Sequence, residues 1–198
     1  MRTIVQEGHE VLRGKARDIP VADITSPRIR ELVADMKSLL AKEEYGVAIA
    51  APQVGEPLRL FIVAGKATAK RSKSNRKRNK EDNADEDDMP KEDQVYINPE
   101  LLKISRAKSP KHEGCLSIRG QWGVVPRAEK ATVRAYNEHG QVFTRGASGF
   151  LAHVFQHELD HLEGILYIDK ATEIYDDSST DSTSSRRAHS EQPDQHEE

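Results

Sequence analysis

The sequence predicts an α+β domain in which antiparallel strands pack around a central buried helix. Three observations lead to this prediction. An amphipathic helix in the first quarter of the chain is followed by several short strand-like segments, two of these segments alternate apolar and polar residues as hairpin strands do, and the last helix is apolar on nearly every side. Because helices and strands are grouped rather than strictly alternating, their order favours α+β over a parallel α/β sheet.

The first predicted element is a helix over residues 26–42, SPRIRELVADMKSLLAK. Ser26 provides an N-cap, and Pro27 suits the first helical position. Apolar side chains then recur at helical spacing and predict one buried face: Ile29, Leu32, Val33, Met36, Leu39 and Leu40. Residues 46–55, GVAIAAPQVG, follow this helix, and their composition favours a tight loop close to other backbone.

The central part of the chain reads as strands. Residues 59–64, RLFIVA, and residues 95–104, VYINPELLKI, are rich in β-branched and aromatic side chains. Residues 124–137, VVPRAEKATVRAYN, alternate apolar and polar positions, NEHG then supplies a turn, and residues 141–147 return as a partner strand. The last two segments therefore predict an antiparallel hairpin.

A second helix is expected over residues 148–164, SGFLAHVFQHELDHLEG. Ser148 can cap its start, and Gly164 is typical of a helix end. Apolar residues occur around most of its circumference, which indicates a helix surrounded by other elements. Histidines on such a helix lie in an environment where an unpaired imidazole is costly.

Two segments contain too few apolar residues to offset their ordering entropy. The first, at about residues 66–93, has a Lys/Arg block followed by an acidic block, and the second, residues 176–198, is rich in Ser and acidic residues. We therefore expect one folded domain over residues 1–175 with a disordered charged insert, followed by a disordered tail. The insert falls between two predicted strands, so it is interpreted as a lengthened hairpin loop.

Global features restrict the function only weakly. A formal net charge of -3 gives no general argument for binding nucleic acid or membranes. No stretch approaches the roughly 20 apolar residues of a membrane span, and the first residues do not resemble a signal peptide, so a cytoplasmic protein without a membrane partner is expected. The single cysteine, Cys115, excludes an internal disulfide and is either buried or chemically employed.

The segment QHELDH, residues 156–161, carries the most specific chemical pattern. His157 and His161 are four positions apart and share one helix face, where both can bind one metal ion. Glu158 projects about 100° around the helix from His157, within reach of a water molecule on that ion. The pattern also occurs by chance in charged helices, but the apolar character of this helix weakens that interpretation.

A catalytic metal site needs a third protein ligand beside these two histidines. Glu163 is too close along the same helix, and Asp169 lies past its end. Cys115 in EGCLS is expected on a loop, where its neighbour Gly114 allows a close approach, and coordination would account for the only cysteine of the chain. Cys115 is therefore the candidate third ligand.

Three stretches, GVAIAAPQVG, EGCLS and QHELDH, resemble the three signature motifs of peptide deformylases, in the same order along the chain. The resemblance extends from HEVLRGKA to GILYID and omits the insert and the tail. It implies a peptide deformylase-like fold and an enzyme that removes the formyl group from the N-terminal formyl-methionine of newly synthesised polypeptides, releasing formate. It also implies that Cys115, His157 and His161 bind one divalent metal, for which ferrous iron (Fe2+) is the usual ion and nickel, cobalt or zinc can substitute.

The resemblance also assigns roles in catalysis. A metal-bound water is expected to attack the formyl carbon, while Glu158 first accepts its proton and then delivers it to the leaving amine. The side chain of Gln53 and the backbone N–H of Leu116 are expected to bind the formyl oxygen, where negative charge develops. These roles follow from the family's motifs rather than from residue spacing.

Substrate binding is assigned in the same way. Gly46, Val47 and Ala48 belong to the motif that lies beside the substrate. Val47, Phe150 and Val154 match positions that line the methionine pocket, although each could equally be a core residue. Ala48 replaces a glycine of the family, so its methyl group is expected to narrow the groove.

The resemblance has implications for four further positions. Glu113 and Arg127 are expected to form a salt bridge that fixes the segment presenting Cys115. Asp160 is expected either to orient a ligating imidazole or to be an exposed helix carboxylate. Arg119 stands where proline is common, and this position is not expected to touch the chemistry.

The expected partners are N-formyl-methionyl nascent peptides and, through the Lys/Arg block at residues 66–80, the ribosome. A solvated loop without a role is the alternative interpretation of that block. Two other functions stay open at this point: a metalloendopeptidase that cleaves internal peptide bonds, and a non-catalytic protein of the same fold that binds nascent chains or ribosomes.

Overall fold

Antiparallel sheets dominate the fold, as the sequence predicts. The computed structural model describes residues 2–65 and 92–176. A five-stranded sheet has the order β1-β2-β3-β6-β7 and a three-stranded sheet the order β4-β5-β8, with every neighbouring pair antiparallel. The strands are β1 (Ala48–Ala50), β2 (Leu60–Val63), β3 (Gln94–Ile104), β4 (Lys108–Cys115), β5 (Ile118–Ala128), β6 (Lys130–Tyr136), β7 (Val142–Ser148) and β8 (Glu173–Asp176). The helices are α1 (Pro27–Lys42) and α3 (Gly149–Leu162), with the short 3-10 segments η1 (Glu10–Arg13), η2 (Val21–Asp23), η3 (Ala51–Val54) and η5 (Tyr167–Asp169).

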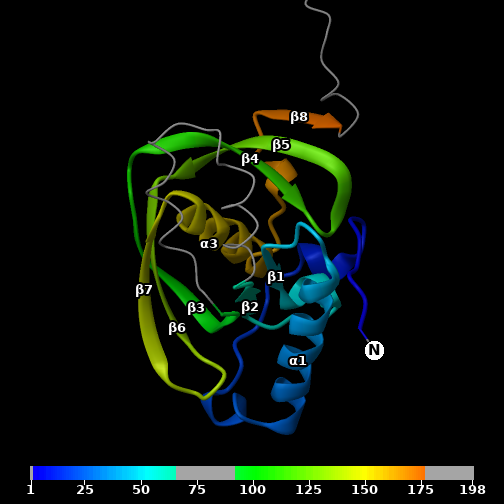
Figure 1. The fold of residues 1–198 in the computed structure, drawn as a ribbon, viewed down its shortest axis with the longest axis vertical. Helices are drawn as coiled ribbons and strands as arrows, with labels where there is room; N and C mark the ends of the chain where they lie inside the picture. Colours follow the sequence, from blue (N-terminus) through cyan, green and yellow to red (C-terminus); the bar gives the residue numbers. More distant parts are fainter. Residues whose placement is uncertain (1, 66–91, 177–198) are drawn as a thin grey trace, which may run out of the picture.

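Helix α3 lies between the two sheets, and α1 lies apart from it beside β1 and β2 (Figure 1). The apolar side chains of α3 form one core with the five-stranded sheet. In this core the ring of Tyr96 stacks on that of Phe61, with centroids 4.5 Å apart, and meets Phe155 of α3 edge-on at 5.2 Å. Such aromatic contacts add to the burial of apolar area, so they fix α3 firmly against β2 and β3.

Helix α1 begins and ends as predicted. The Oγ of Ser26 accepts a hydrogen bond from the backbone N–H of Ile29, and Pro27 occupies the first turn. The predicted apolar face is buried except for Leu39, which is partly buried. This face forms a second core with one side of β1 and β2.

Strand β2 connects the two cores. Phe61 and Val63 belong to the core with α3, whereas Leu60 and Ile62 belong to the core with α1. Successive side chains of a strand point to opposite faces, so a strand covered on both faces reads as a continuous apolar run.

Residues 124–137 do not form one strand, contrary to the expectation. Their first half belongs to β5, which pairs with β4, and their second half is β6, which pairs with β3 and β7. The chain changes sheets at Glu129, whose backbone N–H and C=O bond to Ala107 and Gly149. Each half has one buried face, so apolar and polar residues alternate through both strands and give no sign of where β5 ends and β6 begins.

Two segments expected as loops are regular structure. Residues 46–55 contain β1 and η3, and Gly55 follows η3 with a φ of 83°, a value that suits glycine. Cys115 is the last residue of β4 rather than a loop residue. Ser148 occupies the N-cap position of α3, but its side chain makes no capping hydrogen bond, so that detail of the prediction is wrong.

Nearly all of the predicted disordered insert and tail lies outside the described residues. The flanking strands β2 and β3 pair as neighbours, with Val63 opposite Gln94. Next to this pair, the backbone N–H of Gly65 donates to the side chain of Asp93 at 2.9 Å. The two ends of the insert therefore meet at one place on the domain, as a hairpin loop requires.

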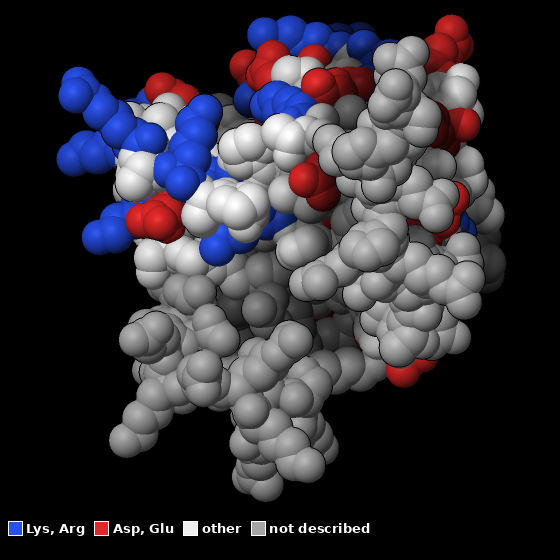
Figure 2. All heavy atoms as spheres, turned by 90° about the horizontal axis from the view of Figure 1, so that it is seen from above, with Lys and Arg blue, Asp and Glu red and all other residues white. Residues whose placement is uncertain are grey.

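Charge is unevenly distributed over the surface. Figure 2 shows Lys and Arg side chains gathered on one side of the face seen from above, with fewer Asp and Glu between them. Lys103 near the end of β3, Arg106 in the turn after it and Lys108 at the start of β4 are exposed. In the part of the chain that the structure describes, no helix is long and apolar enough to cross a membrane.

Candidate metal and catalytic site

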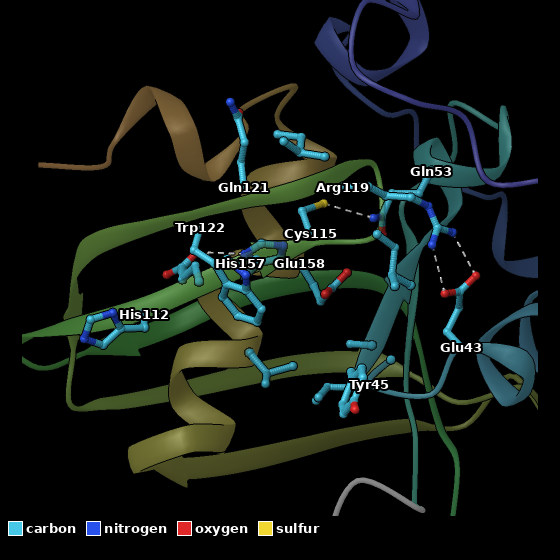
Figure 3. A pocket seen from close by; sticks show the side chains of 18 of the residues that line it. Glu43, Tyr45, Gln53, His112, Cys115, Arg119, Gln121, Trp122, His157 and Glu158 are labelled. Carbon is cyan, nitrogen blue, oxygen red and sulfur yellow. Dashed lines mark hydrogen bonds and ion pairs between the residues drawn. The ribbon is translucent and has the colours of Figure 1, made fainter. Parts of the chain in front are cut away.

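The end of β4 and one face of α3 bring three metal-binding side chains together. Cys115 ends β4, and His157 and His161 lie on successive turns of α3. The Sγ of Cys115 is 3.3 Å from Nε2 of His161, and one ligand atom from each residue lies within 4.8 Å of the others. These separations suit three ligands of a single ion. Figure 3 shows Cys115, His157 and Glu158 grouped beside one pocket.

The surroundings of Cys115 favour its thiolate form. Burial alone would raise the pKa of this thiol, but the charge of His161 and hydrogen bonds with His157 and His161 outweigh that effect. They hold the pKa well below its ordinary value. Because the thiolate is the form that binds metals, the site is electrostatically suited to a cation.

Glu158 is buried beside these ligands. It is 3 % exposed, and burial raises its pKa to about 7. Among the described residues, its Oε2 and the Nδ1 of His161 have no hydrogen-bond partner. Buried polar atoms are costly when unpaired, so Oε2 of Glu158, which lies beside the three ligands, indicates a site that a bound group completes.

Gln53 reaches the site from η3. Its Oε1 accepts a hydrogen bond from the backbone N–H of Ala50 at 2.8 Å, which fixes the orientation of the amide. Its Nε2 then lies 3.3 Å from both the Sγ of Cys115 and the Oγ of Ser117. The amide therefore donates to both atoms, and an oxygen of a bound molecule can replace the thiol as an acceptor because sulfur is a weak one.

A pocket of about 650 Å³ opens beside these groups (Figure 3). Its walls come from the segment leading into β1, from β4 and β5, and from α3. All residues predicted to contact the substrate line it: Gly46, Val47, Ala48, Gln53, Leu116, Phe150, Val154 and Glu158. Apolar walls next to the metal-binding side chains suit a molecule with an apolar side chain and a polar end that reacts.

Gly46 has a structural requirement of its own. A Cβ at this position would lie 2.8 Å from the Cβ of Glu43 and 2.9 Å from Cδ1 of Leu40. Such distances are shorter than real Cβ contacts, so the segment packs against the end of α1 only with glycine here. Gly46 therefore sets the distance between α1 and the pocket wall.

A buried ion-pair network supports the ligands. The predicted salt bridge between Glu113 and Arg127 is present, with both side chains almost fully buried. The Oε2 of Glu113 also accepts a hydrogen bond from Nδ1 of His157 at 2.8 Å. Burial alone would raise the pKa of Glu113, but hydrogen bonds from Arg127, His153 and His157 hold it well below its ordinary value. This carboxylate is therefore ionised.

Asp160 has neither of the two roles that were expected. Its carboxylate lies 2.6 Å from Nη1 of Arg127 and 2.6 Å from Nζ of Lys170, and its side chain is mostly buried. Glu113, rather than Asp160, contacts a candidate ligand imidazole. Asp160 instead continues the buried ion-pair network to the surface.

His153 is a pocket residue that the sequence reasoning missed. It lies one turn before His157 on α3, and its Nε2 is 2.9 Å from Oε1 of Glu113. Its spacing of four residues from His157 was an available signal, because residues at i and i+4 share a helix face.

Arg119, which was not expected to touch the chemistry, lines the pocket. Its Nη2 is 3.0 Å from Oε1 of Glu43, and both residues line the pocket (Figure 3). The ring of Trp122 lines the same pocket and lies so close to Gly114 that a Cβ there would be 3.1 Å from it. Local sequence carries no signal for either contact, because each joins separate strands or a strand and a helix end.

Comparisons with known proteins agree with this geometry. A family model described as polypeptide deformylase matches residues 1–176. The chain is 37% identical over 172 residues to a peptide deformylase of Desulforudis audaxviator, which covers 87% of this chain and 94% of the relative.

Solved structures give the same result. The chain is similar to the peptide deformylase of Thermotoga maritima, with a TM-score of 0.71, 27% identity and coverage of 87% of this chain and 99% of that one. It is also similar to the class I type b peptide deformylase of Acinetobacter baumannii with Met-Ala-Ser bound, with a TM-score of 0.69, 30% identity and coverage of 85% and 97%.

Proposed function

The chain belongs to the polypeptide deformylase family, and on this basis we propose that it hydrolyses the N-formyl group from the N-terminal formyl-methionine of newly synthesised polypeptides and releases formate. The observation that carries the proposal is the meeting of Cys115, His157 and His161 beside Glu158 in one pocket. The relative from Acinetobacter baumannii has Met-Ala-Ser bound, a peptide that corresponds to a deformylated product, and this supports a methionyl peptide as the ligand here.

The donor set supports one divalent metal ion held by Cys115, His157 and His161. A thiolate with two imidazoles suits ferrous iron, nickel, cobalt and zinc, and we propose ferrous iron as the physiological ion. Three protein ligands leave a position for an exchangeable ligand. When bound, such an ion acts as a Lewis acid that lowers the pKa of water and polarises a carbonyl.

Glu158 is proposed as the group that moves the proton. A pKa of about 7 lets this carboxylate accept a proton from the attacking water and later donate one to the leaving amine. Its unpaired Oε2 is available for the hydrogen bond to water that this transfer requires. Burial raises the pKa and at the same time limits the access of bulk water.

Two hydrogen-bond donors are proposed to bind the formyl oxygen. Negative charge develops on this oxygen during the attack, and donors held in place beforehand stabilise it without further reorganisation. Gln53 offers the N–H groups of an amide that Ala50 already orients. The backbone N–H of Leu116, directly after Cys115, is the proposed second donor.

The methionine side chain is proposed to contact Val47, Phe150 and Val154. All three line the pocket and belong to the core around α3 or pack against it, so packing holds their side chains in place. The backbone of Gly46 and Ala48 lies along the same wall. An unbranched apolar side chain fits such a lining better than a charged one.

A formate-release assay with formyl-Met-Ala-Ser tests the proposed function. The protein is prepared without oxygen and loaded with ferrous iron or nickel, because ferrous iron beside a thiolate oxidises readily. We expect equal amounts of formate and Met-Ala-Ser. Cleavage of an internal peptide bond would indicate a metalloendopeptidase, and binding without turnover a non-catalytic relative; either result would reject the proposal.

A further inference from the structure

The carboxylate of Glu113 is surrounded by donors. Its Oε1 accepts a hydrogen bond from Nε of Arg127 and lies 2.9 Å from Nε2 of His153, while its Oε2 accepts from Nη2 of Arg127 and Nδ1 of His157. An ionised carboxylate has about four acceptor sites, so these contacts occupy all of them. Glu113 is 2 % exposed, and its position is therefore set by these side chains rather than by solvent.

His153 and His157 approach Glu113 from the same helix face but through different nitrogens. An ionised carboxylate can only accept, so His157 donates from Nδ1 and His153 from Nε2. In the neutral form of His157, a proton on Nδ1 leaves Nε2 unprotonated, and this is the tautomer that can bind a metal through Nε2.

We propose that His153 is a positioning residue for the ligand His157 and acts through Glu113. This inference rests on the metal site of the proposed function. His153 and Arg127 together fix Oε1, and because a carboxylate is rigid and planar, Oε2 is then held against His157. The ring orientation and the tautomer of His157 are thereby set before any metal binds.

A purely structural role for His153 makes a different prediction. Its ring lies edge-on to that of Phe150, with centroids 5.7 Å apart, and it lines the same pocket. If His153 only supported this wall, substitution would alter substrate binding and leave metal affinity unchanged. Metal affinity therefore separates the two roles.

Three variants make the test specific. His153→Leu removes the donor and keeps an apolar side chain in the wall, which leaves one acceptor site of the buried Glu113 unmet and free to attract water. His153→Gln keeps an N–H donor. Phe150→Leu changes the same wall but none of the donors to Glu113, and it serves as the matched control.

Zinc affinity, measured by competition with a chelator, is the main readout. His153→Leu should weaken zinc binding by about tenfold, which is the smaller of the losses in metal affinity typical when a residue that orients a metal ligand is removed. The zinc affinity of His153→Gln should stay within about threefold of that of the unmodified protein. Phe150→Leu should raise KM for formyl-Met-Ala-Ser and leave zinc affinity unchanged. Equal zinc affinity in His153→Leu and the unmodified protein would overturn the inference. Failure of the unmodified protein to bind zinc would instead reject the metal site itself.

A second measurement does not depend on the folding of a variant. Long-range 1H–15N correlation spectra of the unmodified zinc-loaded protein report which ring nitrogen of each histidine carries a proton. We expect the proton on Nε2 of His153 and on Nδ1 of His157. A neutral His153 with its proton on Nδ1 would lack the required donor, and the inference would then be wrong.

Discussion

The Sγ of Cys115 lies 3.3 Å from Nε2 of His161, although 46 residues separate the two in the chain. Strand β4 supplies the thiol and helix α3 supplies the imidazole, so neither element contains the pair alone. One ion bound between them would join the strand to the helix.

Cys115→Ala should therefore lose both the metal and the activity. Two imidazoles on one helix face do not complete a site with three protein ligands. Metal content after dialysis and formate release from formyl-Met-Ala-Ser are the measurements. Stoichiometric metal in an active Cys115→Ala protein would contradict the ligand assignment.

Glu158→Gln should keep the metal and the fold but lose at least about a hundredfold in turnover, the scale of general acid–base catalysis. The amide is close to the carboxylate in size but cannot accept the proton. Because this variant retains the three ligands, it is also the control for Cys115→Ala in the metal measurement. Turnover close to normal would show that another group moves the proton.

Ala48→Gly should lower KM for the formylated peptide more than it raises kcat. Ala48 lines the pocket from β1, where it pairs with Val63, and removing its methyl group would widen the groove without changing the metal ligands. Glycine within a strand also costs roughly 0.5–1 kcal/mol, so a small decrease in thermal stability should accompany the change. An unchanged KM would show that the methyl group does not crowd the substrate.

Arg127→Leu should destabilise the fold by about 3–5 kcal/mol, because it leaves the buried Glu113 without its Arg cation and removes one of the two cations that pair with Asp160. Arg134→Ala is the matched control. Arg134 pairs with Glu100 at an exposed position, and such pairs contribute less than about 1 kcal/mol. Urea denaturation of both variants measures the free energy of unfolding. Similar decreases in the two variants would show that the buried network stabilises the fold no more than an exposed ion pair does.

Replacing residues 67–91 by a short turn should leave kcat on formyl-Met-Ala-Ser nearly unchanged. The strands on either side already pair, and Gly65 bonds to Asp93, so the new turn would close a hairpin that exists. Co-sedimentation with ribosomes over a series of salt concentrations tests the second role of this segment. Weaker and less salt-sensitive binding of the shortened protein is expected if the Lys/Arg block contacts ribosomal RNA. Equal binding would rule that contact out.

Local sequence patterns were sufficient to predict several helices and strands and part of the site. The caps and the 3.6-residue period predicted α1, since these signals depend only on neighbouring residues. The spacing of His157 and His161 predicted that both imidazoles share one helix face, for the same reason. The resemblance of three short motifs then indicated Cys115 as the third ligand before any contact between them was known.

Tertiary packing determined the strand pairing and the contacts between remote elements, which these local patterns do not encode. Residues 124–137 alternate without interruption, yet the chain changes sheets at Glu129, because a strand's period is the same whichever partner it pairs with. The pairing of Arg119 with Glu43 and the contact of His153 with Glu113 likewise depend on where separate elements meet. Hydrophobic periodicity reports that a face is buried, whereas hydrogen-bond partners across the fold are set by distances between elements that are remote in the chain.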